Sequence, residues 1–227
     1  MDNNYIFELK DAHFSYLGRY PALRGIDITV RQGEQIAVIG ANGCGKSTLL
    51  HILDGLIFAD RGSFKAFGKE LKEGAFNRAD FSRDFRKKVG LVFQNPDVQL
   101  FCPTVKEDIV FGPLQLGVEK GEIQRRLEGL VSILNIWDLL ERPPQQLSIG
   151  EKRKVAIAST HDLHILEEIS DTVYVFSPEK RIVRSGCPHE VLADEQLLKD
   201  NNLLHIHSHR HRDKTHIHSH VHLEHHG

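Results

Sequence analysis

The sequence predicts an α/β fold, because its 227 residues combine strand-like alternation, helix-like periodicity and a glycine-rich loop. Ile26, Ile28 and Val30 alternate with polar residues as in a half-buried strand, and residues 36–39 form a short apolar run that ends at the loop. Further along, apolar residues recur at helical spacing, namely Ile123, Leu127, Leu130, Val131 and Leu134. Strands and helices mixed around one loop indicate an α/β core.

Other segments extend this core. The apolar run at 89–93 predicts a second buried strand, and residues 173–176 predict a third, which is followed by a turn at 177–180. A short helical pattern runs through Leu163, Leu166 and Ile169. We expect one globular domain over residues 1–204 and a separate tail over residues 205–227.

The glycine-rich loop carries the clearest chemical signal. Residues 40–48 match the phosphate-binding pattern G-x-x-x-x-G-K-[ST] directly after an apolar run. Glycines let the backbone aim N–H groups at phosphate oxygens, and the helix expected from Lys46 adds the positive end of its dipole. We expect Lys46 to bind the β- and γ-phosphates of a nucleoside triphosphate and the Ser47 hydroxyl to hold Mg²⁺. The expected binding set is Gly40, Asn42, Gly43, Gly45, Lys46, Ser47 and Thr48.

The composition argues against a nucleic-acid partner, a disulfide framework and a membrane span. The formal net charge of −2 gives no global field that favours nucleic acid as a partner. Cys44, Cys102 and Cys187 are far apart and fit a reducing compartment. The first residues lack a signal-peptide pattern, and no stretch reaches the roughly 18 apolar residues of a membrane span. We expect a chain that is soluble on its own.

The stretch from residue 205 is rich in histidine and predicts a disordered, metal-binding tail. Imidazole suits Ni²⁺, Co²⁺, Zn²⁺ and Cu²⁺, and binding should weaken below about pH 6.5 as the rings gain protons. An affinity tag is the alternative, but serine, isoleucine and valine interrupt the histidines. The candidate ligands are His205, His207, His209, His211, His216, His218, His220 and His222.

Four more motifs follow one another in a fixed order. Tyr16 precedes the first strand pair, and Gln94 opens the segment 94–101 after an apolar run. Ser148 and Gly150 lie in Leu-Ser-Ile-Gly-Glu before a basic helix start, and His161 is followed by an aspartate. Together with the phosphate loop, this order resembles the ABC-type ATPases. More narrowly, it is similar to the ATP-binding subunits of energy-coupling-factor importers for cobalt or nickel, over about residues 5–200.

The resemblance implies a phosphate-loop NTPase core and a role for each motif. It implies that Tyr16 stacks on adenine, that Gln94 contacts Mg²⁺ or the attacking water, and that His161 binds the γ-phosphate. Ser148 and Gly150 would cap the ATP held by a second protomer, which is either an identical copy or a paired ATPase subunit. Implied partners are a transmembrane coupling subunit and a substrate-binding membrane subunit, with the chain peripheral on the cytoplasmic face of the membrane.

The chain departs from this family pattern between Ser148 and His161, which are only thirteen positions apart. The family has a strand–helix–strand segment here, which needs about thirty residues or more. Its aspartate completes the Mg²⁺ shell and its glutamate polarises the attacking water, so hydrolysis should be impaired. We place the junction at 159/160 and expect an incomplete central sheet, which leaves either a hole in the core or an exposed edge.

Two explanations remain open for this departure. Either the sequence lacks a segment that the natural protein contains, which the intact flanking motifs favour, or the chain is a true internal-deletion variant. The first explanation predicts a subunit that couples ATP binding and hydrolysis to uptake of cobalt or nickel. The second predicts a non-hydrolysing regulatory or storage protein that binds nucleotide and metal.

Overall fold

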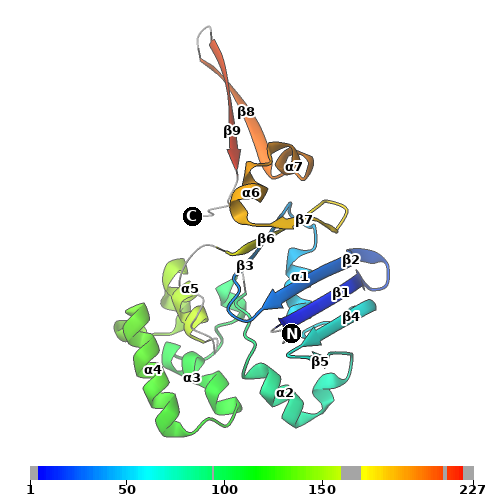
Figure 1. The fold of residues 1–227 in the computed structure, drawn as a ribbon. Coiled ribbons are helices and arrows are strands. Elements are labelled where there is room, and N and C mark those ends of the chain that lie inside the picture. The colour runs from blue at the N-terminus through cyan, green and yellow to red at the C-terminus, as the bar shows by residue number, and fades with distance from the viewer. Residues whose placement is uncertain (1–4, 94, 160–169, 212–213, 222–227) are drawn as a thin grey trace. The chain divides into compact units, whose positions relative to one another are not determined.

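The computed structural model describes residues 5–93, 95–159, 170–211 and 214–221, giving the backbone alone at residue 157 and from residue 204 onward. The chain divides into two compact units, one of residues 1–73 and 168–227 and the other of residues 74–167 (Figure 1). The first unit holds the described strands, and the second is helical in its regular structure. The predicted α/β fold is therefore confirmed.

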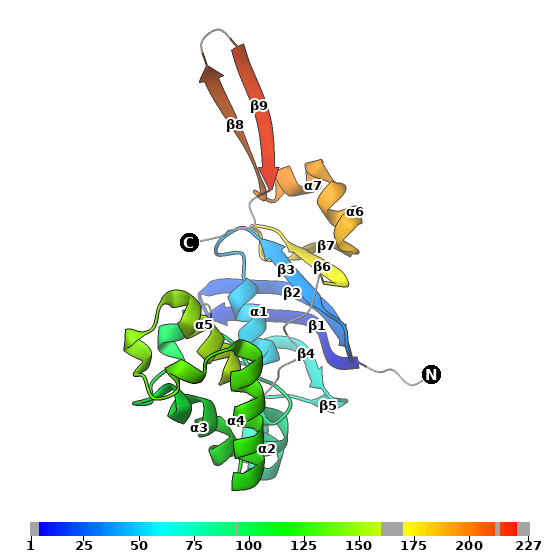
Figure 2. The same cartoon turned by 90° about the vertical axis from the view of Figure 1, so that its left-hand side faces the viewer.

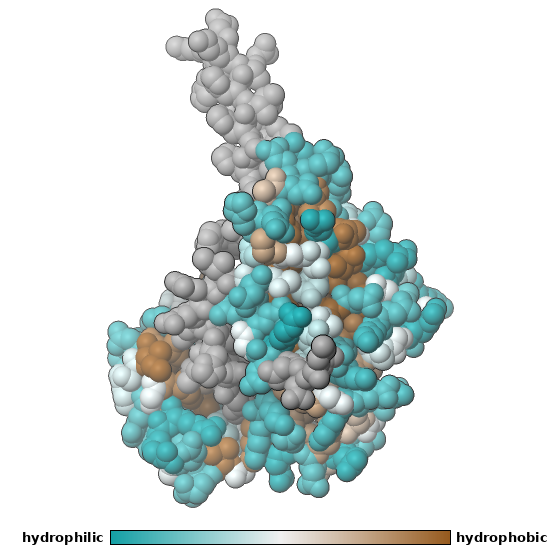
Figure 3. All heavy atoms as spheres, viewed as in Figure 1, coloured by the Kyte–Doolittle hydropathy of each residue, from teal (hydrophilic) through white to brown (hydrophobic). Residues whose placement is uncertain are grey.

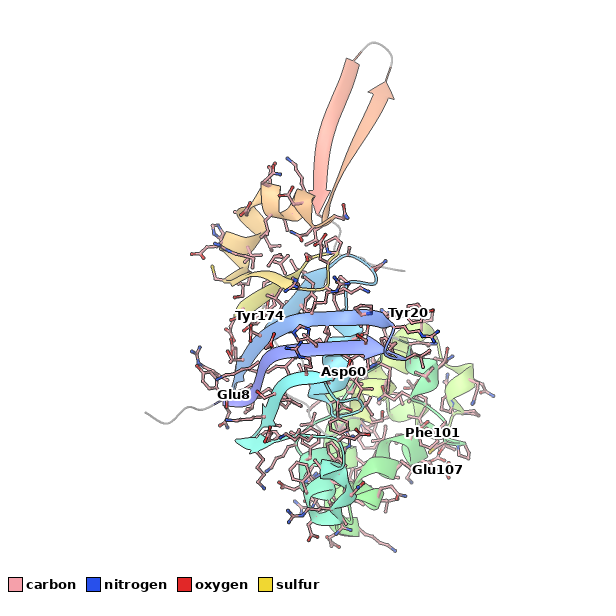
Figure 4. All side chains as sticks on the ribbon, turned by 90° about the vertical axis from the view of Figure 1, so that its right-hand side faces the viewer. Glu8, Tyr20, Asp60, Phe101, Glu107 and Tyr174 are labelled. Carbon is pink, nitrogen blue, oxygen red and sulfur yellow. The ribbon has the colours of Figure 1, made fainter. Side chains whose placement is uncertain are left out.

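The first unit contains an antiparallel sheet of four strands in the order β2-β1-β4-β5. Its strands are β1 (Tyr5–Tyr16), β2 (Tyr20–Arg31), β4 (Arg61–Ala66) and β5 (Lys69–Glu70). The alternation at Ile26 and Ile28 buries both side chains in β2, as predicted. The backbone N–H of Ser15 donates to the carboxylate of Asp60 at 2.7 Å, which fixes the segment before β4 against β1 (Figure 4).

A second sheet of the same unit has the order β3-β6-β7. Its strands are β3 (Ile36–Gly40), β6 (Thr172–Phe176) and β7 (Ile182–Gly186), with β3 parallel to β6 and β7 antiparallel to β6. The helices of the unit are α1 (Lys46–Leu53), α6 (Pro188–Ala193) and α7 (Glu195–Asp200). The Tyr174 hydroxyl donates to the Thr29 carbonyl oxygen at 3.2 Å and so joins the two sheets. The strand at 173–176 and the turn at 177–180 are confirmed.

The central sheet is incomplete, as expected. In the described part of the chain, β3 has a strand partner on one side only, and all five of its residues remain partly exposed. The strand predicted at 89–93 is wrong, because the structure gives these residues no regular secondary structure. A β-strand needs a neighbour to satisfy its backbone N–H and C=O groups, and the strands expected beside this run belong to the absent segment.

The second unit is a cluster of helices around one apolar core. Its α-helices are α2 (Ala79–Arg86), α3 (Val105–Gln115), α4 (Lys120–Leu134) and α5 (Ile149–Ala158). Short 3₁₀ turns lie at Ala75–Asn77, Pro96–Val98, Trp137–Leu139 and Pro144–Gln146. The apolar stripe predicted on α4 is buried throughout. Residues 155–158 belong to α5, where Val155 and Ala156 are fully buried, so this run is helix and not the strand that the family pattern expects before its histidine.

The disorder expected of the tail stays a prediction. Its backbone forms β8 (Leu204–His211) and β9 (Lys214–Val221), which pair antiparallel into a hairpin directly after α7 (Figure 2). Alternation of histidine with isoleucine, serine or valine has the two-residue period of a strand.

Candidate functional site

The phosphate loop connects the end of β3 to the start of α1, as the motif predicts. Gly45, the residue before α1, has a φ of 114°, and a side-chain carbon there would lie 2.4 Å from the Ala22 carbonyl oxygen. A side-chain carbon at Gly40 would lie 2.7 Å from the Cys44 sulfur and 2.8 Å from Phe176 Cβ. Both distances are below any normal carbon contact, so only glycine fits at these two positions.

The loop concentrates positive charge and backbone donors. Lys46 Nζ donates to the carbonyl oxygens of Gly40 and Ala41 at 2.7 and 3.0 Å, so the ammonium group lies against the loop. The first turn of α1 has no acidic residue to offset its dipole. At Gly43 a side-chain carbon would meet no atom within 4 Å, so the outer side of the loop is open. The cradle therefore fits a triphosphate, with the exposed Ser47 at the first turn of α1 available for Mg²⁺.

Tyr16 lies beside the same helix although it is far from it in sequence. Its hydroxyl is 3.2 Å from Thr48 Oγ1, and Thr48 is buried. The Tyr16 ring packs edge-on against Phe14 with centroids 5.0 Å apart, yet 43% of the residue remains exposed. An aromatic ring that is fixed by a neighbouring ring and remains partly exposed to solvent can stack on a planar ligand ring.

The second unit carries the Ser148 motif at the start of α5. Ser148 accepts a hydrogen bond from the Glu151 backbone N–H, while its own hydroxyl and backbone N–H donate to the Glu151 carboxylate, both at 2.7 Å. This reciprocal arrangement is a capping box. The hydrogen bonds from Ser148 lower the pKa of Glu151. Glu151 therefore fixes Ser148 at the start of α5.

Gly150 is not required by the packing around it. A side-chain carbon there would meet no atom within 4 Å, and the residue is exposed in the first turn of α5. Among the described residues, the helix start at Gly150 therefore has open space beside it.

Sequence reasoning missed the contacts that join the segment after residue 94 to α5. The Gln99 side-chain amide donates to the Ala156 carbonyl oxygen at 2.7 Å and to Ser159 Oγ at 2.8 Å. Lys152 Nζ forms an ion pair with Asp97 at 2.7 Å. These partners are more than fifty residues apart, so no local pattern indicates them, and they couple two predicted motifs within one unit.

Several predicted site residues fall outside the described part of the chain. Gln94, His161 and His222 belong to this group, as does the helical pattern at 163–169. Among residues whose side chains the structure describes, no group of three or more histidines, cysteines or carboxylates could hold a metal ion. None of the described helices has the length and apolar character needed to span a bilayer.

An apolar cavity of about 180 Å³ lies where α5 ends. Ile109, Pro113, Leu130, Ile133 and Ala158 contribute to its wall. Ala158 is the last residue of α5 and directly precedes the expected junction.

The comparisons with known proteins agree with one another. A family model described as ABC transporter matches residues 23–164. The chain is 48% identical to the nickel import ATP-binding protein NikO of Rhodobacter capsulatus, over 87% of this chain and 95% of that protein. It is 34% identical to the energy-coupling factor transporter ATP-binding protein EcfA of Methanocaldococcus jannaschii, over 88% of this chain and 85% of that protein.

A solved structure shows the same fold. CbiO1 from Clostridium perfringens, described as part of the ABC transporter complex CbiONQ, superposes with a TM-score of 0.70 at 27% identity. The superposition covers 88% of this chain and 96% of that chain.

The sequence alignments are longer than the chain itself. The alignment to NikO spans 244 positions, whereas 87% of 227 residues is about 197, so about 47 positions have no residue in this chain. The alignment to EcfA spans 242 positions. A deficit of this size accommodates the strand–helix–strand segment whose absence the spacing of Ser148 and His161 predicts.

Proposed function

Because the chain belongs to the ABC transporter ATP-binding family, we propose that it binds ATP in a membrane importer whose cargo is nickel or cobalt. Similarity to its relatives shows, without specifying the cargo, that it is an ATP-binding subunit of the ABC or energy-coupling-factor type. The observation that carries the proposal is the phosphate loop, whose two obligatory glycines and adjacent ammonium group form a cradle for a polyphosphate.

The first unit would bind the phosphates, the adenine and Mg²⁺ of ATP. Lys46 and the loop amides would bind the phosphates, and Tyr16 would stack on the adenine. Ser47 would hold Mg²⁺, which neutralises phosphate charge when it is bound. In the second unit, Ser148 and Gly150 offer a helix start to the ATP of another protomer, so a complete site takes two ATPase subunits. Gln94 and His161 keep their proposed roles at the magnesium ion and the γ-phosphate.

The second unit also carries an apolar surface suited to a membrane subunit. Phe101 is 64% exposed, and its ring packs edge-on against the exposed Phe111 of α3, with Leu114 one turn further on. Figure 3 shows that the face in view is largely hydrophilic, with apolar surface in separate areas. Exposed aromatic pairs are typical of interfaces, so we expect the transmembrane coupling subunit to dock at this pair. The substrate-binding membrane subunit would complete the importer.

The histidine-rich stretch and the nickel-import relative support the same cargo. Imidazole ligands suit nickel and cobalt, and the stretch places them on the ATPase subunit itself. Calorimetry with Ni²⁺ and Co²⁺, on the full chain and on a chain ending at residue 204, tests this assignment. Identical isotherms for the two proteins would remove it.

A second candidate function rests on the incomplete sheet. The partly exposed β3 and the long alignments favour a chain that lacks the strand with the magnesium-binding aspartate and the catalytic glutamate. Loss of a positioned general base costs about 10²–10⁴ in rate. Such a chain would bind ATP and metal as a regulatory or storage protein without turning over.

One experiment tests ATP binding, which both candidates require, and the expected loss of the catalytic base. ATP binding is measured with a fluorescent analogue and steady-state hydrolysis with phosphate release, using Lys46→Ala as the blank. We expect binding above the blank and hydrolysis equal to it. Hydrolysis well above the blank would show that a base is present after all. A folded chain that fails to bind ATP at millimolar concentration would overturn both candidates.

A further inference from the structure

Both hydrogen-bond donors of Ser148 are used within its own helix start. The Ser148 hydroxyl and the Ser148 backbone N–H donate to the same oxygen of Glu151, Oε2, at 2.7 Å each. The hydroxyl oxygen in turn accepts from the Glu151 backbone N–H at 3.3 Å. Because a serine hydroxyl has a single proton to donate, the Ser148 hydroxyl cannot serve a second acceptor while it serves Glu151.

Glu151 places a negative charge at the start of α5. The hydrogen bonds from Ser148 are the main cause of the lowered pKa of its carboxyl, so the group is ionised at neutral pH and can only accept hydrogen bonds. The charges of Arg142 and Lys154 contribute to the same lowering of the pKa. The helix start therefore combines a carboxylate with cations that would themselves attract a phosphate.

The γ-phosphate of an incoming ATP has the same needs as this carboxylate. Both groups are anions that accept hydrogen bonds, so they compete for the Ser148 proton, and their like charges repel each other. We propose that Glu151 is an internal competitor of the γ-phosphate, which gains the Ser148 hydroxyl only when the Glu151 carboxylate releases it. The carboxylate thereby weakens the ATP-dependent pairing of two ATPase subunits. This inference rests on the proposed function, in which Ser148 caps the ATP of another protomer.

Glutamine at position 151 would separate the structural role of the side chain from its charge. Glutamine has nearly the same size and also serves in a capping box, so the start of α5 should remain folded. Its neutral oxygen accepts more weakly than a carboxylate, and its amide N–H groups can donate to a phosphate. Glu151→Gln should therefore free the Ser148 hydroxyl and leave the nearby cations without an opposing charge.

Sedimentation velocity of the full chain, with and without ATP, measures the pairing. We expect Glu151→Gln to pair about tenfold more tightly than the parent chain when ATP is present. Its ATP affinity should be unchanged, because the phosphate loop lies in the other unit. Glu128→Gln in α4 is the matched control, since it removes the same charge from an exposed side chain that accepts from Gln124 at 2.7 Å. This control should pair as the parent does.

The Ser148→Ala background tests whether the effect passes through the hydroxyl. Without that hydroxyl there is no proton to compete for, so Glu151→Gln should improve pairing by less than about threefold. Equal pairing of the parent and Glu151→Gln, or a tenfold gain that persists in the Ser148→Ala background, would overturn the inference while leaving ATP binding intact. A folded parent chain that binds no ATP would overturn the proposed function and this inference with it.

Discussion

The hydroxyl of Tyr16 lies 3.2 Å from Thr48 Oγ1, which joins the end of the first strand to the helix that follows the phosphate loop. The contact places an aromatic ring beside a site for phosphates although 32 residues separate the two side chains. The proposed function therefore assigns the base and the phosphates to different residues of one unit, and the two roles can be tested separately.

Replacement of Tyr16 by alanine should weaken ATP binding while leaving inorganic triphosphate binding unchanged. Loss of one stacked aromatic costs about 1–3 kcal/mol, which is about fivefold to 150-fold in Kd. Competition titrations with the two ligands measure the difference. Tyr20→Ala is the matched control, because Tyr20 opposes Tyr16 in the strand register and is exposed, but does not contact Thr48. Equal losses for both ligands would contradict the adenine role.

Gly45→Ala should abolish ATP binding and destabilise the fold. The new Cβ would lie 2.4 Å from the Ala22 carbonyl oxygen in a backbone conformation that alanine rarely adopts. We expect a loss of about 2 kcal/mol or more in the free energy of unfolding. Urea denaturation and ATP titration measure the two effects. Normal ATP affinity in this variant would show that the loop tolerates a side chain.

Gly150→Ala should separate stability from function. Since a Cβ at Gly150 meets no atom within 4 Å, alanine should stabilise α5 by about 0.5 kcal/mol through its helix propensity. The same carbon would obstruct the close approach of a second protomer's ATP, so ATP-dependent dimerisation should weaken. Sedimentation velocity with and without ATP measures it. Gly129→Ala in α4 also meets no atom within 4 Å and should give the stability gain with unaltered dimerisation.

Cys102 should resist alkylation at neutral pH. Burial raises the pKa of the Cys102 thiol from 9.0 to about 11, with further contributions from the hydrogen bond to Asp108 and the charges of Asp108 and Glu107. The folded state therefore keeps its proton where the unfolded state loses it. The resulting stability is fully present below about pH 9 and is lost as the pH rises towards about 11.

Mass spectrometry after iodoacetamide treatment at pH 8 tests this prediction. The exposed Cys187 should be modified first and Cys102 last. Asp108→Asn removes the charge while keeping the size of the side chain, so it should lower the pKa of Cys102 and speed its modification. An unchanged rate in this variant would assign the shift to burial alone.

Local sequence patterns correctly predicted the features of the fold that depend on residues close together in sequence. The stripe of α4 and the phosphate loop depend on spacing within a few residues, and both match the structure. The run at 89–93 has the composition of a strand but adopts no regular structure, because a strand also needs a neighbour. The close approach of the Ala22 carbonyl oxygen to Gly45 and the ion pair of Lys152 with Asp97 join segments that are distant in sequence. A local sequence pattern therefore cannot predict either contact.

The open side of β3 has a consequence for how the protein behaves when it is produced. Among the strands that the structure describes, β3 has no neighbour on one side, and a short apolar strand with such an edge is a template on which another polypeptide can add a strand. We expect freshly synthesised copies to self-associate in a concentration-dependent manner and to accumulate in the insoluble fraction at high expression. Slow synthesis at low temperature, or co-expression with an intact ATPase partner, should raise the soluble yield.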